Sequence, residues 1–178
     1  MQIVRDPGEL SDYMRFAVRA SPEHPVLIDR FLADAIEVDV DAICDGTQVV
    51  VGGIMEHIEE AGVHSGDSAC VIPPVVLSEE NQATMVDIVK RVSIRLGVVG
   101  LVNVQFAVQN EVVYVIEVNP RASRTVPYVS KARGVPLAAM ATRLCLGESS
   151  ADLGTLPELA KNGTYYIKAP VFPWGRFD

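Results

Sequence analysis

Cysteine is scarce in this chain of 178 residues. The three cysteines, Cys44, Cys70 and Cys145, are widely spaced and odd in number. That pattern excludes a disulfide framework, which needs cysteine pairs, and a zinc knuckle, which needs closely spaced metal ligands. We therefore expect a reducing compartment, and the cytoplasm is the simplest one.

Long apolar runs and a basic surface are also missing. No stretch reaches the ~18 apolar residues that a membrane span requires, and no charged start followed by an apolar segment opens the chain. The 15 basic and 23 acidic residues give a net charge of −8. This charge argues against nucleic acid and anionic membranes as partners, so any anionic substrate would need local arginines or bound cations.

What the chain does have is an ordinary globular composition. Hydrophobic residues make up 49% of it and charged residues 21%, and the sequence contains no internal repeat or low-complexity segment. A chain of this length and composition can bury a real core. Disorder is therefore excluded as the main description of the chain.

The apolar pattern predicts a mixed α/β chain with an antiparallel sheet. Helices are expected at residues 10–20, between Ser78 and Gly97, and at 136–146. Strands are expected at residues 2–4, 26–31, 35–43, 48–57 and 165–171. Asp45 and Gly46 supply turn chemistry, so a hairpin should join the third and fourth of these strands.

The most informative segment is a further predicted hairpin, which spans residues 103–119. Side chains two apart in a strand share a face. With a turn within residues 109–112, centred on Glu111, one face becomes a continuous apolar surface. Its members are Val104, Phe106, Val108, Tyr114, Ile116 and Val118.

The other face of this hairpin gathers oxygen-bearing side chains. Gln105 would lie directly across from Glu117, and Asn119 follows two residues later on the same side. Mg²⁺ and Mn²⁺ prefer such oxygens, and Mg²⁺ takes only one or two carboxylates when substrate phosphates complete its shell. The alternative is a half-exposed hairpin with ordinary polar residues on its wet face, which alternation alone favours.

Two arginines shift this balance toward a metal–nucleotide site. Arg121 and Arg124 flank Ala122 and Ser123 just beyond Pro120, which ends the strand pattern. Their guanidinium groups can bind phosphates that a metal on Gln105, Glu117 and Asn119 would bridge.

These motifs, together with their neighbours, closely resemble the large subunit of carbamoyl-phosphate synthase, a member of the ATP-grasp superfamily. The resemblance rests on residues 62–68 (GVHSGDS), 103–119 and 119–127 (NPRASRTVP), and it extends over nearly the whole chain, from residues 2–4 through 28–32 to the terminal FPWGRF. Residues 56–70 (EHIEEAGVHSGDSAC) resemble the second synthetase half, which phosphorylates carbamate. The fold implied is an ATP-grasp domain of the α+β type, with an antiparallel sheet and helices packed on one face.

The resemblance implies roles for further residues. The positions that would line ATP are Arg30, Leu32, Glu37, Gly62, Val63, His64, Ser65, Gln105 and Glu117. Glu37 would take the ribose hydroxyls, although a single acidic residue on a wet strand face is the simpler reading of that position alone. The divalent-metal positions would be Gln105, Glu117 and Asn119, with Arg121 and Arg124 stabilising the phosphates.

A potassium ion beside the glycine-bracketed loop is also implied. Its ligands would be side-chain or backbone oxygens of Glu37, His57, Glu59, Val63 and Ser68. Residues 62–68 do not form a Walker-type phosphate loop, and without the resemblance a glycine-bracketed surface turn is the simpler interpretation.

The family resemblance also predicts the chain's context. It implies a cytoplasmic ligase of arginine and pyrimidine biosynthesis that makes carbamoyl phosphate from bicarbonate, glutamine-derived ammonia and two ATP. Its partners would be the rest of the large subunit and a glutaminase small subunit. The family's glycine-rich phosphate-covering loop and its preceding basic residues would lie upstream of residue 1, so residues 1–178 are expected to be part of one domain and inactive alone.

Two alternatives remain open at this point. Another ATP-grasp ligase, such as a biotin-dependent carboxylase, shares the metal-bearing hairpin but should lack the loop at residues 64–68. A non-catalytic fragment of the fold would bind nucleotide weakly or only pack against partner segments.

Overall fold

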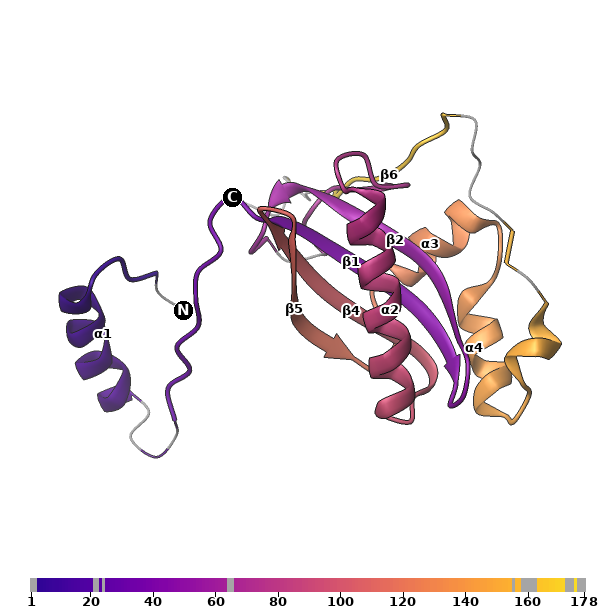
Figure 1. Cartoon of the computed structure of the whole chain (residues 1–178), viewed down its shortest axis with the longest axis horizontal. Coiled ribbons are helices and arrows are strands. Elements are labelled where there is room, and N and C mark those ends of the chain that lie inside the picture. Colours follow the sequence, from indigo (N-terminus) through magenta and orange to yellow (C-terminus); the bar gives the residue numbers. More distant parts are fainter. Residues whose placement is uncertain are drawn as a thin grey trace. The chain divides into compact units, whose positions relative to one another are not determined.

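The computed structural model describes residues 3–20, 23, 25–63, 66–154, 156–157, 163–171 and 175 (Figure 1). The chain forms two compact units, Met1–Ala33 and Asp34–Asp178. The first unit contains helix α1, Pro7–Ala20. Asp6 begins it, because its Oδ1 accepts hydrogen bonds from the backbone N–H groups of Gly8 and Glu9, at 2.7 and 2.9 Å.

The first unit confirms one predicted element and corrects another. The helix expected at residues 10–20 is present and starts three residues earlier. The strand expected at 26–31 is wrong, since these residues form no regular element. An apolar run becomes a strand only when a neighbouring strand satisfies its backbone groups.

The second unit is built on a six-stranded antiparallel sheet with the order β5-β4-β1-β2-β3-β6. The strands are β1 Ile36–Asp45, β2 Val49–Glu60, β3 Cys70–Ile72, β4 Val99–Gln109, β5 Val112–Asn119 and β6 Tyr166–Lys168. The two predicted hairpins, β1–β2 and β4–β5, are confirmed. The final strand is shorter than the predicted 165–171, and the sequence pattern had not indicated β3.

Helices cover both faces of this sheet, which corrects the expectation of one covered face. Helix α2, Glu79–Arg95, packs on the face that carries Val38, Val40 and Phe106. Helices α3, Val126–Arg133, and α4, Leu137–Cys145, pack on the opposite face against Ile43 and Met55 (Figure 1). Strand β1 contributes side chains to the hydrophobic core on each face of the sheet, because its even-numbered residues face α2 while Ile43 faces α3 and α4.

Helix ends explain why two of the three α-helices in the described part of this unit were predictable; a short 3-10 helix, Ser150–Leu153, follows them. Ser78 caps α2 by accepting a hydrogen bond from the N–H of Asn81, and Leu96 and Gly97 end it, as predicted. Helix α4 matches the predicted 136–146 within two residues. Helix α3 was missed, because its eight residues are too few to show a clear apolar period.

The β4–β5 hairpin differs in one respect from the prediction. Its turn is the two residues Asn110 and Glu111, both with positive φ, so Gln109 pairs with Val112. A β-bulge between Gln105 and Phe106 then inserts one extra residue in β5. The prediction of Glu117 as the partner of Gln105 is therefore confirmed. The structure reaches this pairing by a two-residue turn and a bulge, and the prediction had assumed a turn centred on Glu111.

The bulge also corrects the apolar face of β5. Val113 and Val118 pack on the core although their parity differs, because the extra residue lies between them. Tyr114 pairs with Ala107, and Ile116 is 55% exposed, so placing these two on the core face was wrong. The prediction for Val118 is confirmed.

The turn between β1 and β2 gives a first testable prediction. The carboxylate of Asp45 accepts hydrogen bonds from the N–H groups of Ser150, Gln48 and Thr47, at 2.8, 2.7 and 2.9 Å, and these hold its pKa below the usual range. Because the unfolded chain binds this proton more tightly, the carboxylate stabilises the fold above pH ~4 and loses that contribution as the pH falls. Asp45→Asn should lower the free energy of unfolding at pH 7 by about 1 kcal/mol, discounted for partial exposure.

Urea denaturation at pH 7 and at about pH 2.5 checks this expectation. The difference between Asp45→Asn and the unmodified chain should shrink at the lower pH. An equal difference at both pH values would assign the effect to packing rather than to the charge.

Candidate functional site

Polar side chains form two rows across the centre of the sheet, on the face opposite α2. In the first row Glu117 of β5 pairs with Gln105 of β4, which pairs with Asp39 of β1. In the second row Asn119 pairs with Asn103, which pairs with Asp41. Paired residues in neighbouring strands lie side by side on one face, so the register brings these six side chains together.

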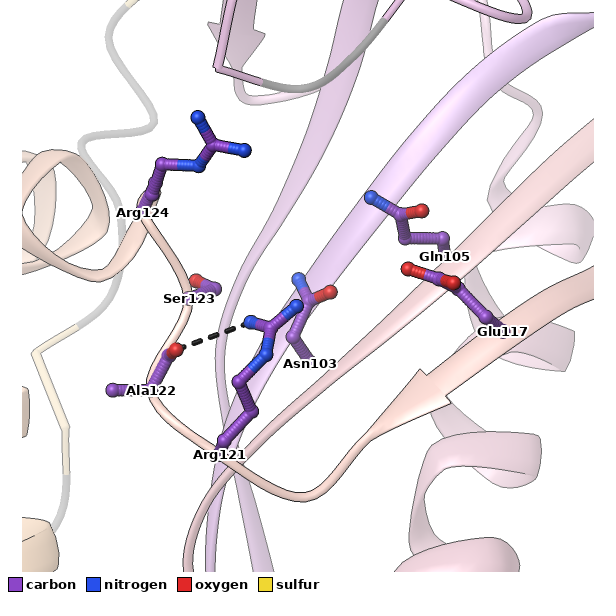
Figure 2. Close-up of a pocket in the computed structure, with 7 residues that line it drawn as sticks. All are labelled: Asn103, Gln105, Glu117, Arg121, Ala122, Ser123 and Arg124. Carbon is purple, nitrogen blue, oxygen red and sulfur yellow. Dashed lines mark hydrogen bonds between the residues drawn. The ribbon is translucent and has the colours of Figure 1, made fainter.

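A pocket of about 340 Å³ opens beside these rows. Its lining residues are Asn103, Gln105, Glu117, Arg121, Ala122, Ser123 and Arg124. Figure 2 shows Gln105 and Glu117 on one side and the loop that carries Arg121 and Arg124 on the other, with Asn103 between them. Four of the predicted site residues are therefore brought together, with an oxygen-bearing wall facing a cationic one.

Hydrogen bonds fix parts of both walls. Asn119 donates from Nδ2 to Oε1 of Glu117 at 2.8 Å, so it orients the carboxylate from the side. On the other wall, the Nη1 of Arg121 donates to the carbonyl oxygen of Ala122 at 3.1 Å. Gln105 and Glu117 offer the oxygens that a hard divalent cation needs, and the arginines offer donors for phosphate oxygens, so the donor set fits Mg²⁺ or Mn²⁺ with a polyphosphate.

Three buried polar residues, of which Asn103 lines the pocket, were missed by sequence reasoning. Asp39 and Asp41 are fully buried, and Asn103 is 2% exposed. Their alternation with apolar residues predicted a strand with one wet face. That face is instead closed, because β4 pairs with β1 and the loop after β5 folds over it. The spacing along β4 could have indicated Asn103, because it lies two residues before Gln105 and therefore on the same face of the strand.

The amide of Asn103 has a fixed orientation. Its Nδ2 donates both to Oδ1 of Asp39, at 3.0 Å, and to Oδ1 of Asp41, at 2.9 Å. Since carboxylates only accept, the NH₂ group must face them, and the amide oxygen turns toward Gln105 and Glu117 (Figure 2). Asn103 thereby adds a third oxygen to that side of the pocket.

A second cluster lies along β1 and β2, where ligating atoms of Glu37, Asp39 and His57 lie within 4.8 Å of one another. His57 shares a hydrogen bond of 2.7 Å with Asp39 through Nε2 and one of 2.9 Å with the Ser68 hydroxyl through Nδ1. Glu59 accepts from the N–H of Ala69 at 2.7 Å. The structure thus brings together four of the five residues predicted for potassium: Glu37, His57, Glu59 and Ser68.

The pKa of His57 depends on its neighbours in this cluster. Burial has the largest single effect on this pKa and disfavours the imidazolium, but the hydrogen bonds and charges of Asp39 and Cys70 together outweigh it, and the pKa of His57 rises to about 10. The Asp39–His57–Ser68 order resembles a nucleophilic triad, yet Ser68 is fully buried and no substrate could reach it. The cluster suits charge balance or a cation rather than covalent catalysis.

The loop that follows is anchored to the same cluster. Glu37 accepts a hydrogen bond from the N–H of Gly62 at 2.9 Å, so the carboxylate predicted for the ribose hydroxyls also holds the start of the loop. Val63 is exposed, while His64 and Ser65 lie outside the described residues. Lys168 of β6 donates from Nζ to the carbonyl oxygen of Ser68 at 2.6 Å and holds the loop's other end.

Comparison with known proteins shows the family to which this chain belongs. The family model for the carbamoyl-phosphate synthase L chain, ATP-binding domain, matches residues 1–153. The chain belongs to this family. The large chain of Rubrobacter xylanophilus carbamoyl phosphate synthase is 56% identical over 177 residues, and that of Methanospirillum hungatei 65% over 153.

These matches cover 99% and 86% of this chain but only 17% and 14% of the two relatives. Among solved structures, the biotin carboxylase domain of a single-chain bacterial carboxylase is similar, with a TM-score of 0.75 at 18% identity over 95% of this chain and 38% of that one. The ATP-grasp fold is therefore confirmed, and the chain is an ATP-binding domain of its family.

The remaining predicted ATP contacts, Arg30 and Leu32, lie in the first unit. Arg30 is exposed and Leu32 is half-buried there, and both remain predictions. Within the part of the chain that the structure describes, no helix is long and apolar enough to cross a membrane.

Proposed function

We propose that this chain is the metal- and phosphate-binding part of the carbamate-phosphorylating half of a carbamoyl-phosphate synthase large subunit. The observation that carries the proposal is the pocket in which Gln105 and Glu117 face Arg121 and Arg124. The assignment to the carbamate half is supported by the sequence at residues 56–70, which resembles that half.

In the reaction proposed, an oxygen of carbamate attacks the γ-phosphorus of ATP in line, and ADP leaves. The pocket would hold a divalent ion, and the chemistry supplied by that ion would be neutralisation of phosphate charge. Glu117 and Gln105 would hold the ion, with Asn119 orienting the carboxylate. Arg121 and Arg124 would stabilise the charge that spreads over the transferred group, and no covalent enzyme nucleophile is required.

The proposal for the whole protein follows the relatives. It would be a ligase that consumes bicarbonate, glutamine-derived ammonia and two ATP, and it would work with the rest of the large subunit and a glutaminase small subunit in the cytoplasm. Residues 1–178 would then be one part of an ATP-grasp domain, with the phosphate-covering loop supplied by preceding sequence.

Calorimetry with MgATP, followed by an ADP-release assay, tests this function. We expect MgATP binding that Glu117→Ala abolishes, and no ADP release by the chain alone. Joined to the upstream segment of a relative, the chain should release ADP with carbamate and not with bicarbonate. Dependence on bicarbonate would favour a carboxylase-type reaction, and absence of nucleotide binding in the joined protein would reject the site.

Potassium should compete with the proton on His57. We propose that K⁺ binds among Glu37, His57, Glu59, Ser68 and the backbone at Val63. This cluster contains three carboxylates, those of Glu37, Asp39 and Glu59. A cation there would repel the imidazolium, so about 100 mM KCl should lower the pKa of His57 from about 10 by about 1 or more.

NMR titration of the His57 ring measures this, with choline chloride of equal ionic strength as the control. Identical titration curves in the two salts would remove His57 and its neighbours as a potassium site. Glu60→Gln, at an exposed position beside Glu59, is the matched variant that should leave the difference unchanged.

A further inference from the structure

The buried carboxylate of Asp41 joins the two walls of the pocket. On one side its Oδ1 accepts the hydrogen bond from Asn103, which lies in the wall of Gln105. On the other side it accepts from Ser123 Oγ, at 2.8 and 2.9 Å to its two oxygens, and from Thr125 Oγ1 at 2.7 Å. Asp41 itself is fully buried and does not line the pocket.

The two hydroxyl donors belong to the loop that carries both arginines. Ser123 lies directly before Arg124 and two residues after Arg121, and its hydroxyl also contacts that of Thr125 at 2.7 Å. Within the loop, the N–H of Arg121 donates to the carbonyl oxygen of Asn119, the N–H of Val126 donates to that of Ser123 at 3.4 Å, and the N–H of Thr125 donates to Ser123 Oγ. The side chains that meet at Asp41 attach this loop to the sheet.

A carboxylate is a costly choice for this place in the fold. Burial raises the pKa of Asp41 above its ordinary value, and the hydrogen bonds from Thr125, Asn103 and Ser123 offset this rise only in part. Well-packed apolar residues can hold a loop without this desolvation cost. What a carboxylate adds is direction, because its two oxygens fix the donors on both walls at set angles.

We propose that Asp41 is a positioning residue for phosphoryl transfer: it fixes the loop at residues 121–125 so that Arg121 and Arg124 face the wall of Gln105 and Glu117. This inference rests on the proposed function of the pocket. Asp41 does not line the pocket, and Asn103 keeps its hydrogen bond to Asp39 when the Asp41 carboxylate is lost, so this loss should leave Gln105 and Glu117 in place and weaken the hold on the phosphates.

Asp41→Asn tests this role in the 178-residue chain with three readouts. Hydrogen exchange of the amides at 121–126 should speed up by at least about 10-fold, since charge-assisted hydrogen bonds are lost. The affinity for tripolyphosphate with Mn²⁺ should fall by at least about 5-fold, and that for Mn²⁺ alone should change by less than about 2-fold. If Asp41→Asn fails to fold, Thr125→Val removes one donor to the same carboxylate and should shift all readouts in the same direction.

Glu56→Gln is the matched control, because Glu56 is also a buried carboxylate that holds a loop. It accepts from the N–H groups of Val75, Val76 and Leu77, at 3.1, 2.9 and 3.0 Å. This variant should speed exchange at 75–77 and leave 121–126 and tripolyphosphate binding unchanged.

Two results would overturn the assignment of Asp41: unchanged exchange at 121–126 in Asp41→Asn, or equal losses of Mn²⁺ and tripolyphosphate affinity. Failure of the unmodified chain to bind tripolyphosphate with Mn²⁺ would instead overturn the proposed function. The exchange measurements would then still decide whether Asp41 orders the loop.

Discussion

Glu117→Ala is expected to lower the affinity of the chain for Mn²⁺ and for MgATP by at least about 100-fold. Loss of an outer-shell partner of a metal ligand already costs about 10- to 100-fold, and Glu117 is the only carboxylate among the residues that line this pocket. Neutral amides of Gln105 and Asn103 would remain, and they cannot balance the cation's charge. Electron paramagnetic resonance of Mn²⁺ and calorimetry of MgATP measure the two affinities.

The control for Glu117→Ala must remove an equal charge elsewhere. Glu80→Gln does so from an exposed position in α2, which packs on the opposite face of the sheet. Glu80→Gln should bind Mn²⁺ as the unmodified chain does. A loss of similar size in both variants would assign the effect to net charge, and no loss in Glu117→Ala would remove the metal from this pocket.

Phe106→Ala is expected to lower the free energy of unfolding by about 3–5 kcal/mol, the usual cost of deleting a buried phenylalanine. Phe106 is fully buried, and it lies between Val38 of β1 and Val115 of β5 in the register. Typical domains are stable by only about 5–15 kcal/mol, so this single change should bring the chain close to unfolding. Urea denaturation followed by circular dichroism gives the difference.

Val115→Ala is the companion to Phe106→Ala, because Val115 pairs directly with it but is 45% exposed. Its cost should stay below about 1 kcal/mol, since little area leaves water at this position. Similar costs in both variants would mean that the depth of burial does not decide how much each of these two paired side chains stabilises the fold.

The sequence predicted those parts of the fold that depend on local pattern. Ser78 and Gly97 mark the ends of α2, and alternation along β4 separates Phe106 from Gln105. The pairing of Gln105 with Glu117 followed from alternation and a turn, and the positions of Arg121 and Arg124 followed from the proline that ends the strand. The central part of the pocket was therefore predictable before any tertiary contact was known.

Long-range pairing decided what the sequence could not show. Whether Asp39 and Asp41 face water or protein depends on β4, which lies more than sixty residues away in the chain. The same is true of the second covered face of the sheet, which needs α3 and α4 to fold back onto Met55. Local alternation gives the face of a side chain, but only the assembled sheet gives what covers that face.

The bulge in β5 has a consequence for changes in chain length. Ile116 is the extra residue between two regular stretches of pairing, and more than half of its surface is exposed. Deleting Ile116 would join those stretches into one uninterrupted ladder, with Gln105 still opposite Glu117. Deleting a neighbour such as Val113 would instead turn the side chains between the turn and the bulge to the wrong faces of the sheet. Ile116 is thus the position in this hairpin where evolution could shorten the chain and keep the site.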